Sequence, residues 1–173
     1  KNTGGMGAYS PSRLINEELE KKIINKIIKP TLKGLMDLNI EYSGFLYAGL
    51  MIKNNEPFLI EYNVRMGDPE CQVILPRLKT DLVKILIAAL NNKLNKIKIK
   101  WNKNKCMTTV LCAKGYPNKY KINQIINLER IKLNPKSFIF HAGTKYKNNS
   151  LVSYGGRVLN IVVLGDTFSK IRS

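Results

Sequence analysis

The sequence has few residues of the kinds that bind zinc or form disulfide frameworks. Among its 173 residues are three cysteines, Cys71, Cys106 and Cys112, and one histidine, His141. The cysteines form no C-x-x-C pair, and any disulfide between two of them would leave one thiol over. We therefore expect neither a zinc site nor a disulfide framework. The simplest setting is a reduced cytoplasm, and any bound metal should be a hard cation held by oxygen atoms.

Long apolar runs and signal-like segments are also missing. The longest apolar run, ILIAAL at residues 85–90, is far shorter than the roughly 20 residues of a membrane-spanning helix. The N-terminal stretch KNTGGMGAYSP has no starting methionine and no basic segment followed by an apolar one. With 44% hydrophobic residues the chain can build a core. We expect a globular chain with no membrane partner, and we expect it to be an internal segment of a longer protein.

Acidic residues are scarce: 12 Asp and Glu stand against 29 Lys and Arg, which gives a net charge of +17. Such a charge can indicate a nucleic-acid partner. The lysines, however, are scattered through segments such as KKIINKIIKP and LNKIKIKWNKNK, which are also rich in Asn and Ile. These three residue types share AT-rich codons, so biased base composition explains much of the charge. An RNA-binding module is the competing interpretation. We expect no specific nucleic-acid partner and only weak, salt-sensitive affinity for polyanions.

The pattern of apolar residues predicts a mixture of helices and strands in the first half of the chain. Apolar residues recur at helical spacing over residues 16–39, with Asn16 as the N-cap and a bend or division at Pro30. Two apolar runs, residues 42–52 and 58–64, flank the polar turn KNNEP. This arrangement predicts a β-hairpin.

The second half of the chain reads mainly as β-structure. A helical region in two pieces comes first, and Thr80 can cap the second piece. The Lys- and Asn-rich stretch 91–105 has little apolar periodicity, so we expect two domains, 1–98 and 99–173. Beyond it, strands are predicted in CMTTVLCAKG, SFIFHAGTKY and GGRVLNIVVLG, with a turn at KNNS.

Polar residues occupy every second position in part of the stretch FLIEYNVRMGDPE, residues 58–70. Because alternate side chains of a strand share a face, Leu59, Glu61, Asn63 and Arg65 are predicted to point one way, about 7 Å apart. The alternating neighbours, expected to face the core, are Phe58, Ile60, Tyr62 and Val64. A carboxylate and an amide oxygen are ligands for Mg²⁺, and a guanidinium can grip phosphate. An ordinary surface ion pair between Glu61 and Arg65 is the alternative.

Two nearby segments add groups of chemical interest. The sequence GDPE, residues 67–70, supplies a turn and two more carboxylates, which favours a functional site over a simple ion pair. The sequence NTGGMGAYSP carries Gly4, Gly5 and Gly7, which would let backbone amides approach an anion closely. It is not a Walker A loop, because no Gly-Lys-Ser/Thr follows. A flexible connection is the alternative reading of these glycines.

Five motifs together resemble those of a known family. The segments NTGGMGAYSP, YSGFLYAGLMI, IEYNVRMGDPE, FHAGTK and GGRVL occur in the order and spacing of the phosphoribosylamine–glycine ligase family, of the ATP-grasp superfamily. The resemblance covers essentially the whole chain. Tyr62, Val64 and Met66 depart from the usual Phe, Cys and Phe, but they lie outside the polar row. The resemblance implies an α+β fold: the second half of an ATP-grasp domain, with an antiparallel sheet and helices, followed by a small C-terminal β-rich subdomain.

The resemblance also implies a reaction. The family joins glycine to 5-phosphoribosylamine in de novo purine synthesis, and splits ATP to ADP and phosphate through a glycyl phosphate with Mg²⁺ or Mn²⁺. The family's ATP-clamping lobe lies upstream of Lys1, so we expect this segment alone to be inactive. A different ATP-grasp ligase, with another carboxylate and amine, is the competing interpretation.

Roles for individual residues follow from their positions in the family motifs. Glu61 and Asn63 resemble the metal ligands, and Arg65 resembles the residue that steadies the phosphates. Asp68 is expected either to receive the glycine ammonium or to cap the following helix. Leu59 is expected beneath the adenine. The residues expected on the substrate side are Gly4, Gly5, Gly7 and Arg157.

Overall fold

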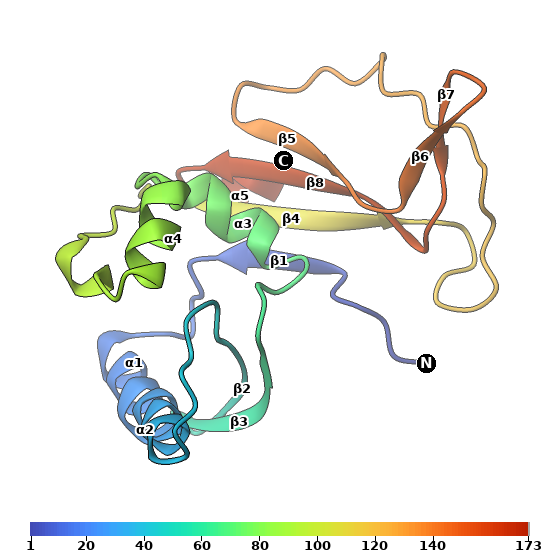
Figure 1. Ribbon diagram of the computed structural model, residues 1–173. Coiled ribbons are helices and arrows are strands. Elements are labelled where there is room, and N and C mark those ends of the chain that lie inside the picture. Colours follow the sequence, from blue (N-terminus) through green and yellow to red (C-terminus); the bar gives the residue numbers. More distant parts are fainter. Residues whose placement is uncertain (173) are drawn as a thin grey trace. The chain divides into compact units, whose positions relative to one another are not determined.

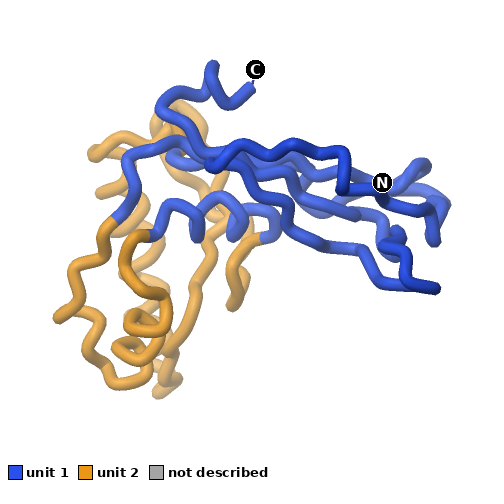
Figure 2. Tube along the Cα trace, turned by 90° about the horizontal axis from the view of Figure 1, so that it is seen from above, with its two compact units in different colours: residues 1–11, 68–78, 101–173 blue, residues 12–67, 79–100 orange. Residues whose placement is uncertain are grey.

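The computed structural model describes residues 1–172, which form two compact units (Figure 2). Unit 1 comprises Lys1–Pro11, Asp68–Leu78 and the chain from Trp101 onward, and unit 2 comprises Ser12–Gly67 and Lys79–Lys100. These units differ from the two consecutive segments expected from the sequence, because the chain leaves unit 1 and returns to it twice. The boundary expected after residue 98 lies close to the second return.

Unit 1 is built on a four-stranded antiparallel sheet with the strand order β1-β4-β8-β5 (Figure 1). The strands are β1 Gly7–Ser10, β4 Lys105–Cys112, β5 Ser137–His141 and β8 Arg157–Gly165. Strand β1 pairs with β4 in a register that sets Gly7 opposite Thr109. This pairing is the reason that the N-terminal residues belong to unit 1 and not to the elements that follow them in sequence.

The core of unit 1 lies between this sheet and the short helix α3, Cys71–Ile74. Val73 of α3 packs with Cys106 of β4 and Val162 and Leu164 of β8, all of them buried. The alternation of apolar residues in β4 and β8 thus places one face of both central strands under the helix. The 3₁₀ helix η2, Leu75–Arg77, continues α3, and α5 spans Phe168–Arg172.

Asparagines form the turns of the two β-hairpins found within residues 1–172. Strands β6, Thr144–Lys147, and β7, Ser150–Ser153, are joined by Asn148 and Asn149, whose φ angles are 47° and 58°. Two-residue hairpin turns require positive φ, which asparagine tolerates better than most residues. Among residues 1–172, every non-glycine residue with positive φ is an asparagine. The turn predicted at KNNS is confirmed.

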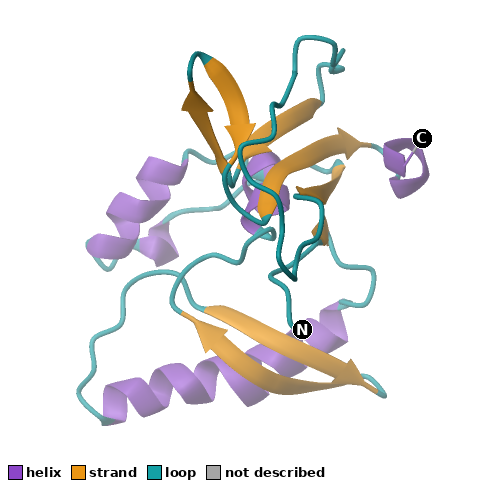
Figure 3. Cartoon of the chain, turned by 90° about the vertical axis from the view of Figure 1, so that its right-hand side faces the viewer, coloured by secondary structure: helices purple, strands orange, loops and turns teal. Residues whose placement is uncertain are grey.

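Unit 2 begins with a long helical segment (Figure 3). This segment includes a π-helical stretch. Its parts are α1 Glu17–Ile23, the π-helix η1 Ile24–Ile28 and α2 Lys29–Asp37. The predicted cap is confirmed, because the Asn16 side chain accepts a hydrogen bond from the Leu19 N–H at 2.8 Å. The helix is not divided at Pro30, because the chain stays helical from residue 17 to residue 37; the π-helical stretch ends at Ile28, two residues before Pro30, which has no N–H to donate to the preceding turn.

The remaining elements of unit 2 are a hairpin and a second helical region. They comprise β2 Tyr47–Lys53, β3 Glu56–Asn63, α4 Leu82–Leu90 and the 3₁₀ helix η3 Leu94–Lys96. The hairpin was predicted, but the cap of α4 was not: Asp81 accepts from the Lys84 N–H at 3.1 Å, whereas the Thr80 hydroxyl accepts from the Lys100 N–H. No helix within residues 1–172 is long and apolar enough to cross a membrane.

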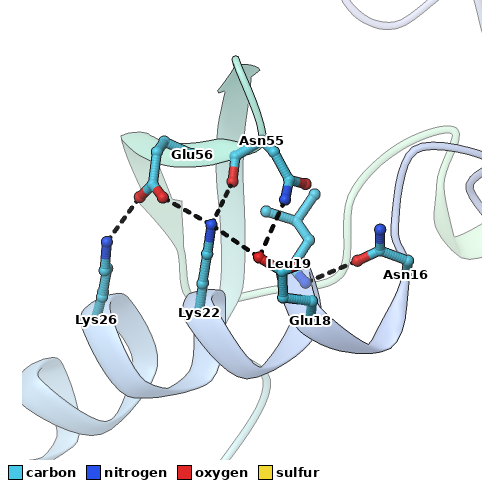
Figure 4. A network of polar contacts seen from close by, with 7 residues as sticks. All are labelled: Asn16, Glu18, Leu19, Lys22, Lys26, Asn55 and Glu56. Atoms are coloured by element: carbon cyan, nitrogen blue, oxygen red, sulfur yellow. Dashed lines mark hydrogen bonds and ion pairs between the residues drawn. The ribbon is translucent and has the colours of Figure 1, made fainter.

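A network of charged residues fastens the tip of the hairpin to α1 and η1 (Figure 4). Glu56, the first residue after the turn, accepts hydrogen bonds from Lys22 Nζ at 2.8 Å and Lys26 Nζ at 2.7 Å. Lys22 also pairs with Glu18 at 3.1 Å and donates to the Asn55 carbonyl. Hydrogen bonds from the two lysines lower the pKa of Glu56 from 4.5 to about 2, and the bond from Lys22 has the larger effect.

We expect Glu56→Gln to destabilise unit 2 at neutral pH, because the substitution removes the charge that both lysines share. The carboxylate has a lower pKa when folded, so its contribution is full above pH 4.5 and is lost as the pH falls toward about 2. Urea unfolding of the full-length protein should give a lower midpoint for the variant at neutral pH, and this difference should shrink in acid.

The matched control is Glu41→Gln, which changes an exposed carboxylate in the same unit. This control should unfold like the wild-type protein at each pH. A difference between Glu56→Gln and wild type that stays constant from neutral pH to about pH 2.5 would contradict the role given to the charge of Glu56.

Candidate functional site

Glu61 and Asn63 lie side by side at the end of β3. Asn63 Nδ2 donates to Glu61 Oε1 at 3.1 Å. Tyr62, between them, points to the opposite face, where its hydroxyl lies 2.6 Å from Thr31 Oγ1 and donates to the Ile27 carbonyl at 3.3 Å. Glu61 and Asn63, hereafter called the polar pair, therefore share one face of the strand, as predicted. That face is turned away from α2 and η1.

A glycine in the neighbouring strand leaves room for the polar pair. Gly49 of β2 stands opposite Glu61 in the hairpin register. A Cβ atom at position 49 would lie 3.2 Å from Glu61 Cγ, which is closer than most side-chain contacts allow. The Glu61 side chain thus lies over the strand at Gly49, and a larger residue there would displace the carboxylate.

A β-bulge at Ile60 breaks the alternation of side chains along β3. Gly49 pairs with Glu61, but the next residue of β2, Leu50, pairs with Leu59. Paired residues share a face and consecutive residues of β2 alternate, so Leu59 and Glu61 lie on opposite faces. The expectation that Leu59 shares the face of the polar pair is wrong, because the extra residue shifts the register by one.

Most of the residues expected to form the buried face of β3 are exposed. Phe58, Ile60 and Val64 are 54%, 64% and 75% exposed, whereas Tyr62 is partly covered by the helical segment. The register places Phe58, paired with Met51, on the face of the polar pair. The prediction of a buried face is thus wrong for those three residues: the bulge at Ile60 moves Phe58 to the other face, and Val64 lies beyond the end of the strand.

Arg65 lies beyond the end of the strand. Strand β3 ends at Asn63, and Arg65 occupies the bend that follows, where its Nη1 donates to the Met66 carbonyl at 3.0 Å. The predicted row of polar side chains therefore holds for Glu61 and Asn63 only. Arg65 is exposed, and a guanidinium has further N–H groups with which to bind an anion.

In unit 1, Arg157 joins the turn at Asp68 to the glycine-rich N-terminal segment. Its Nη2 lies 2.7 Å from Asp68 Oδ2, and its Nη1 donates to the carbonyls of Asp68 at 3.0 Å and Gly5 at 3.1 Å. Gln72 Nε2 donates to the other carboxylate oxygen of Asp68 at 2.9 Å. Helix α3 has Glu70 as its N-cap, and the Glu70 side chain makes no cap hydrogen bond, so both roles expected of Asp68 stay predictions.

The three glycines of the N-terminal segment each lie against another part of unit 1. A Cβ on Gly4 would stand 2.7 Å from Arg157 Cζ, and one on Gly5 would stand 2.3 Å from Pro69 Cδ. Gly7 lies in β1, where a Cβ would approach a β4 carbonyl to 3.0 Å. Close packing within the protein is therefore a sufficient reason for glycine at these positions.

Two further residues contact the Asp68 turn or the N-terminal segment and were not predicted: Gln72 and Tyr116. Gln72 follows Asp68 by four residues, a helical spacing that could have indicated the contact. Tyr116 gave no such signal: its hydroxyl accepts from the Gly4 N–H at 3.3 Å across 112 residues of chain. Its ring lies where a Cβ on Gly156 would be, 2.2 Å from Cδ2.

The three cysteines have no features of nucleophiles. None of them forms a disulfide, and burial raises the pKa of each thiol, that of Cys106 to about 11. A thiol whose thiolate is disfavoured by burial reacts slowly near neutral pH. The chemistry of the chain is therefore better sought at its carboxylates and guanidinium groups.

The polar pair has the donor atoms that suit a hard divalent cation. Within residues 1–172, no three His, Cys, Asp or Glu side chains come together as a metal cluster. Glu61 and Asn63 supply one carboxylate and one amide oxygen on one face. Mg²⁺ is typically held by one or two such ligands, with phosphate oxygens and water at its other positions. The residues present thus fit a cation that is shared with a phosphate ligand.

Comparison with protein-family models gives two matches along the chain. Residues 1–71 match the phosphoribosylglycinamide synthetase ATP-grasp (A) domain, and residues 106–173 match the C domain of the same synthetase. The chain belongs to the phosphoribosylglycinamide synthetase family. The resemblance drawn from the five motifs is confirmed, and so is the α+β fold with its ATP-grasp part. The domain boundary expected after residue 98 falls between the two matches and stays a prediction.

Individual members of this synthetase family are similar along almost the whole chain. A phosphoribosylamine–glycine ligase from Vigna unguiculata is 46% identical over 95% of this chain and 55% of its own length. One from Brucella melitensis is 40% identical over 99% of this chain and 40% of its own. The crystal structure of phosphoribosylamine–glycine ligase from Thermotoga maritima has a TM-score of 0.84 and 34% identity, and covers 99% of this chain. The chain spans 42% of that structure and about half or less of these curated relatives.

We expect Glu61→Gln to weaken divalent-cation binding by roughly tenfold or more, since it removes the only negative charge of the polar pair. The measurement is a Mn²⁺ titration of the full-length protein, followed by electron paramagnetic resonance, with a non-hydrolysable ATP analogue present. Glu41→Gln, an exposed carboxylate in the same unit, should bind as the wild-type protein does. Equal affinities for Glu61→Gln and wild type would show that the pair does not hold the ion.

Proposed function

We propose that this chain is part of an enzyme that ligates glycine to 5-phosphoribosylamine in purine biosynthesis, with ATP split to ADP and phosphate. Two observations support the proposal. The first is that the relatives that match nearly the whole chain carry the name phosphoribosylamine–glycine ligase. The second is that the polar pair offers the ligands that a phosphate-bound cation needs. The polar pair is the observation that carries the proposal, because it links a named reaction to specific atoms.

Glu61 and Asn63 are the residues proposed to hold Mg²⁺ or Mn²⁺. The bound ion would supply positive charge to the ATP phosphates during phosphoryl transfer. Glu61 contributes charge and Asn63 contributes a neutral oxygen, while the hydrogen bond between them fixes their orientation. Leu59 lies on the other face of β3 from the polar pair, so it does not share the face proposed to hold the ion and its phosphates.

Arg65 is proposed to bind phosphate oxygens. It stands two residues beyond Asn63 and is exposed, and its Nη1 donates to the Met66 carbonyl. A guanidinium can place two parallel N–H groups on a phosphate or an acyl phosphate. Its charge would stabilise the oxygens on which negative charge collects as the phosphoryl group moves.

The proposed reaction has two steps, and in each step one bond forms as another breaks. The glycine carboxylate attacks the terminal phosphorus of ATP, which forms glycyl phosphate and releases ADP. The amine of 5-phosphoribosylamine then attacks the glycyl carbonyl and displaces phosphate. The residues proposed for the substrate side are Gly4, Gly5, Gly7, Asp68 and Arg157. The three cysteines, none of which forms a disulfide, suit a reducing compartment such as the cytoplasm.

We expect the full-length protein to release phosphate from ATP only when both glycine and 5-phosphoribosylamine are present. Glu61→Gln should lower kcat/KM by about 100-fold or more, because it removes electrostatic stabilisation of the transferred group. A coupled assay of ADP formation, with each substrate omitted in turn, is the measurement. The chain of residues 1–173 by itself should give no turnover.

Two outcomes would contradict the proposed function. One is ADP formation that proceeds equally well without glycine, or with another amino acid in its place. The other is near-wild-type ligation by Glu61→Gln, measured beside Glu41→Gln as the matched control. A wild-type rate for the control alone would support the assignment of the polar pair.

A further inference from the structure

The contacts of Arg157 and Asp68 point to a role that differs from direct substrate binding. We propose that these two residues are positioning residues, which hold the backbone of Gly4 and Gly5 in place for the substrate side of the site. The inference rests on the proposed function and deepens it. It concerns unit 1 alone, in which all four residues lie.

The carboxylate of Asp68 is already occupied by protein donors. One oxygen accepts from Arg157 at 2.7 Å and the other accepts from Gln72 at 2.9 Å. A substrate ammonium would have to compete with a guanidinium and an amide that are held in place by the fold. The neighbouring charges of Asp68 and Arg157 also offset each other, so neither attracts a charged ligand as a lone group would.

Arg157 is committed to the protein in the same way. Its two terminal nitrogens reach three acceptors: the Asp68 carboxylate, the Asp68 carbonyl and the Gly5 carbonyl. The Arg157 side chain is 24% exposed, against 49% for that of Asp68. Only the planar, forked guanidinium can satisfy these acceptors together, so lysine should not replace it.

The glycines show how closely the N-terminal segment rests on this pair. Gly4 lies directly against the guanidinium, and Gly5 lies against the Pro69 ring. The Gly4 N–H is held by the Tyr116 hydroxyl, so both sides of the segment have a fixed partner. The backbone at Gly4 and Gly5 is therefore set by contacts from three distant parts of the chain. A displacement of about 1 Å in such a segment can cost about 100-fold in rate.

The proposal predicts that Arg157→Lys and Asp68→Asn have the same defect. Each should lower kcat/KM for glycine ligation about 10-fold to 100-fold, with parallel changes in the KM for glycine. The double variant should be no more than about threefold worse than the poorer single variant, because each change already breaks the one contact. Gly5→Ala, which drives the segment off Pro69 and leaves the ion pair in place, should show a similar loss.

Hydrogen exchange gives a readout that does not depend on activity. In the full-length protein, backbone amides of residues 2–7 should exchange faster in Arg157→Lys and Asp68→Asn than in the wild-type protein. Arg130→Lys, a matched change at an exposed arginine in unit 1, should alter neither exchange nor kinetics. Thermal unfolding of each variant shows whether the protein is folded, and Tyr116→Phe offers a milder disturbance of the same segment.

Two results would overturn the proposal. The first is a glycine KM raised tenfold or more in Asp68→Asn with Arg157→Lys near wild type, which would make Asp68 a direct contact of the substrate ammonium. The second is unchanged exchange of residues 2–7 in both variants. Absence of glycine-dependent ADP formation in the wild-type protein would refute the proposed function instead, and the exchange experiment would still test the positioning role.

Discussion

The antiparallel pairing of β4 with β8 is the constraint on which most of unit 1 depends. Strand β4 receives β1 on its other edge, and β8 receives β5, so two segments from opposite ends of the chain meet in one sheet. The buried residues of both central strands pack beneath α3, which follows directly from the Asp68 turn. Arg157, the first residue of β8, is thereby brought to that turn and to Gly5. The cluster at Asp68 is a product of strand pairing and not of local sequence.

In unit 2 the polar pair is positioned in a different way, by a β-bulge within a hairpin. Without the extra residue at Ile60, Leu59 and Glu61 would share a face. With it, Phe58 and Met51 accompany the polar pair instead. Bulges are common beside functional sites because they redirect a side chain at the cost of one unpaired residue. The charged network at Glu56 holds the other end of the same hairpin to the helical segment. The polar pair and its ligand atoms thus rest on a strand that is fixed at its tip and bent near its end.

Local signals in the sequence were enough for much of the fold. Asn16 before a run of helical spacing, and the Asn-containing segments KNNEP and KNNS, predicted a helix start, one hairpin and one further turn correctly, because caps and turns depend on a few adjacent residues. The common face of Glu61 and Asn63 was predicted for the same reason. Strand β7, which completes the second hairpin, was not predicted. Leu59 was misplaced because a bulge leaves no mark in the alternation of residue types. The contacts of Arg157 and Tyr116 could not be foreseen, because they join residues more than a hundred positions away to the N-terminal segment.

The asparagines at the two hairpin turns have a consequence for the unfolded chain. Glycine would meet the positive φ angles of these turns as easily, but it loses more backbone freedom on folding than any other residue. An Asn-Asn turn starts from a narrower set of conformations, so less entropy is lost when the turn closes. Both two-residue turns should therefore form more readily than Gly-Gly turns would. The positions of the flanking strands, and with them the alignment of Glu61 over Gly49, are in this way biased before the strands have paired.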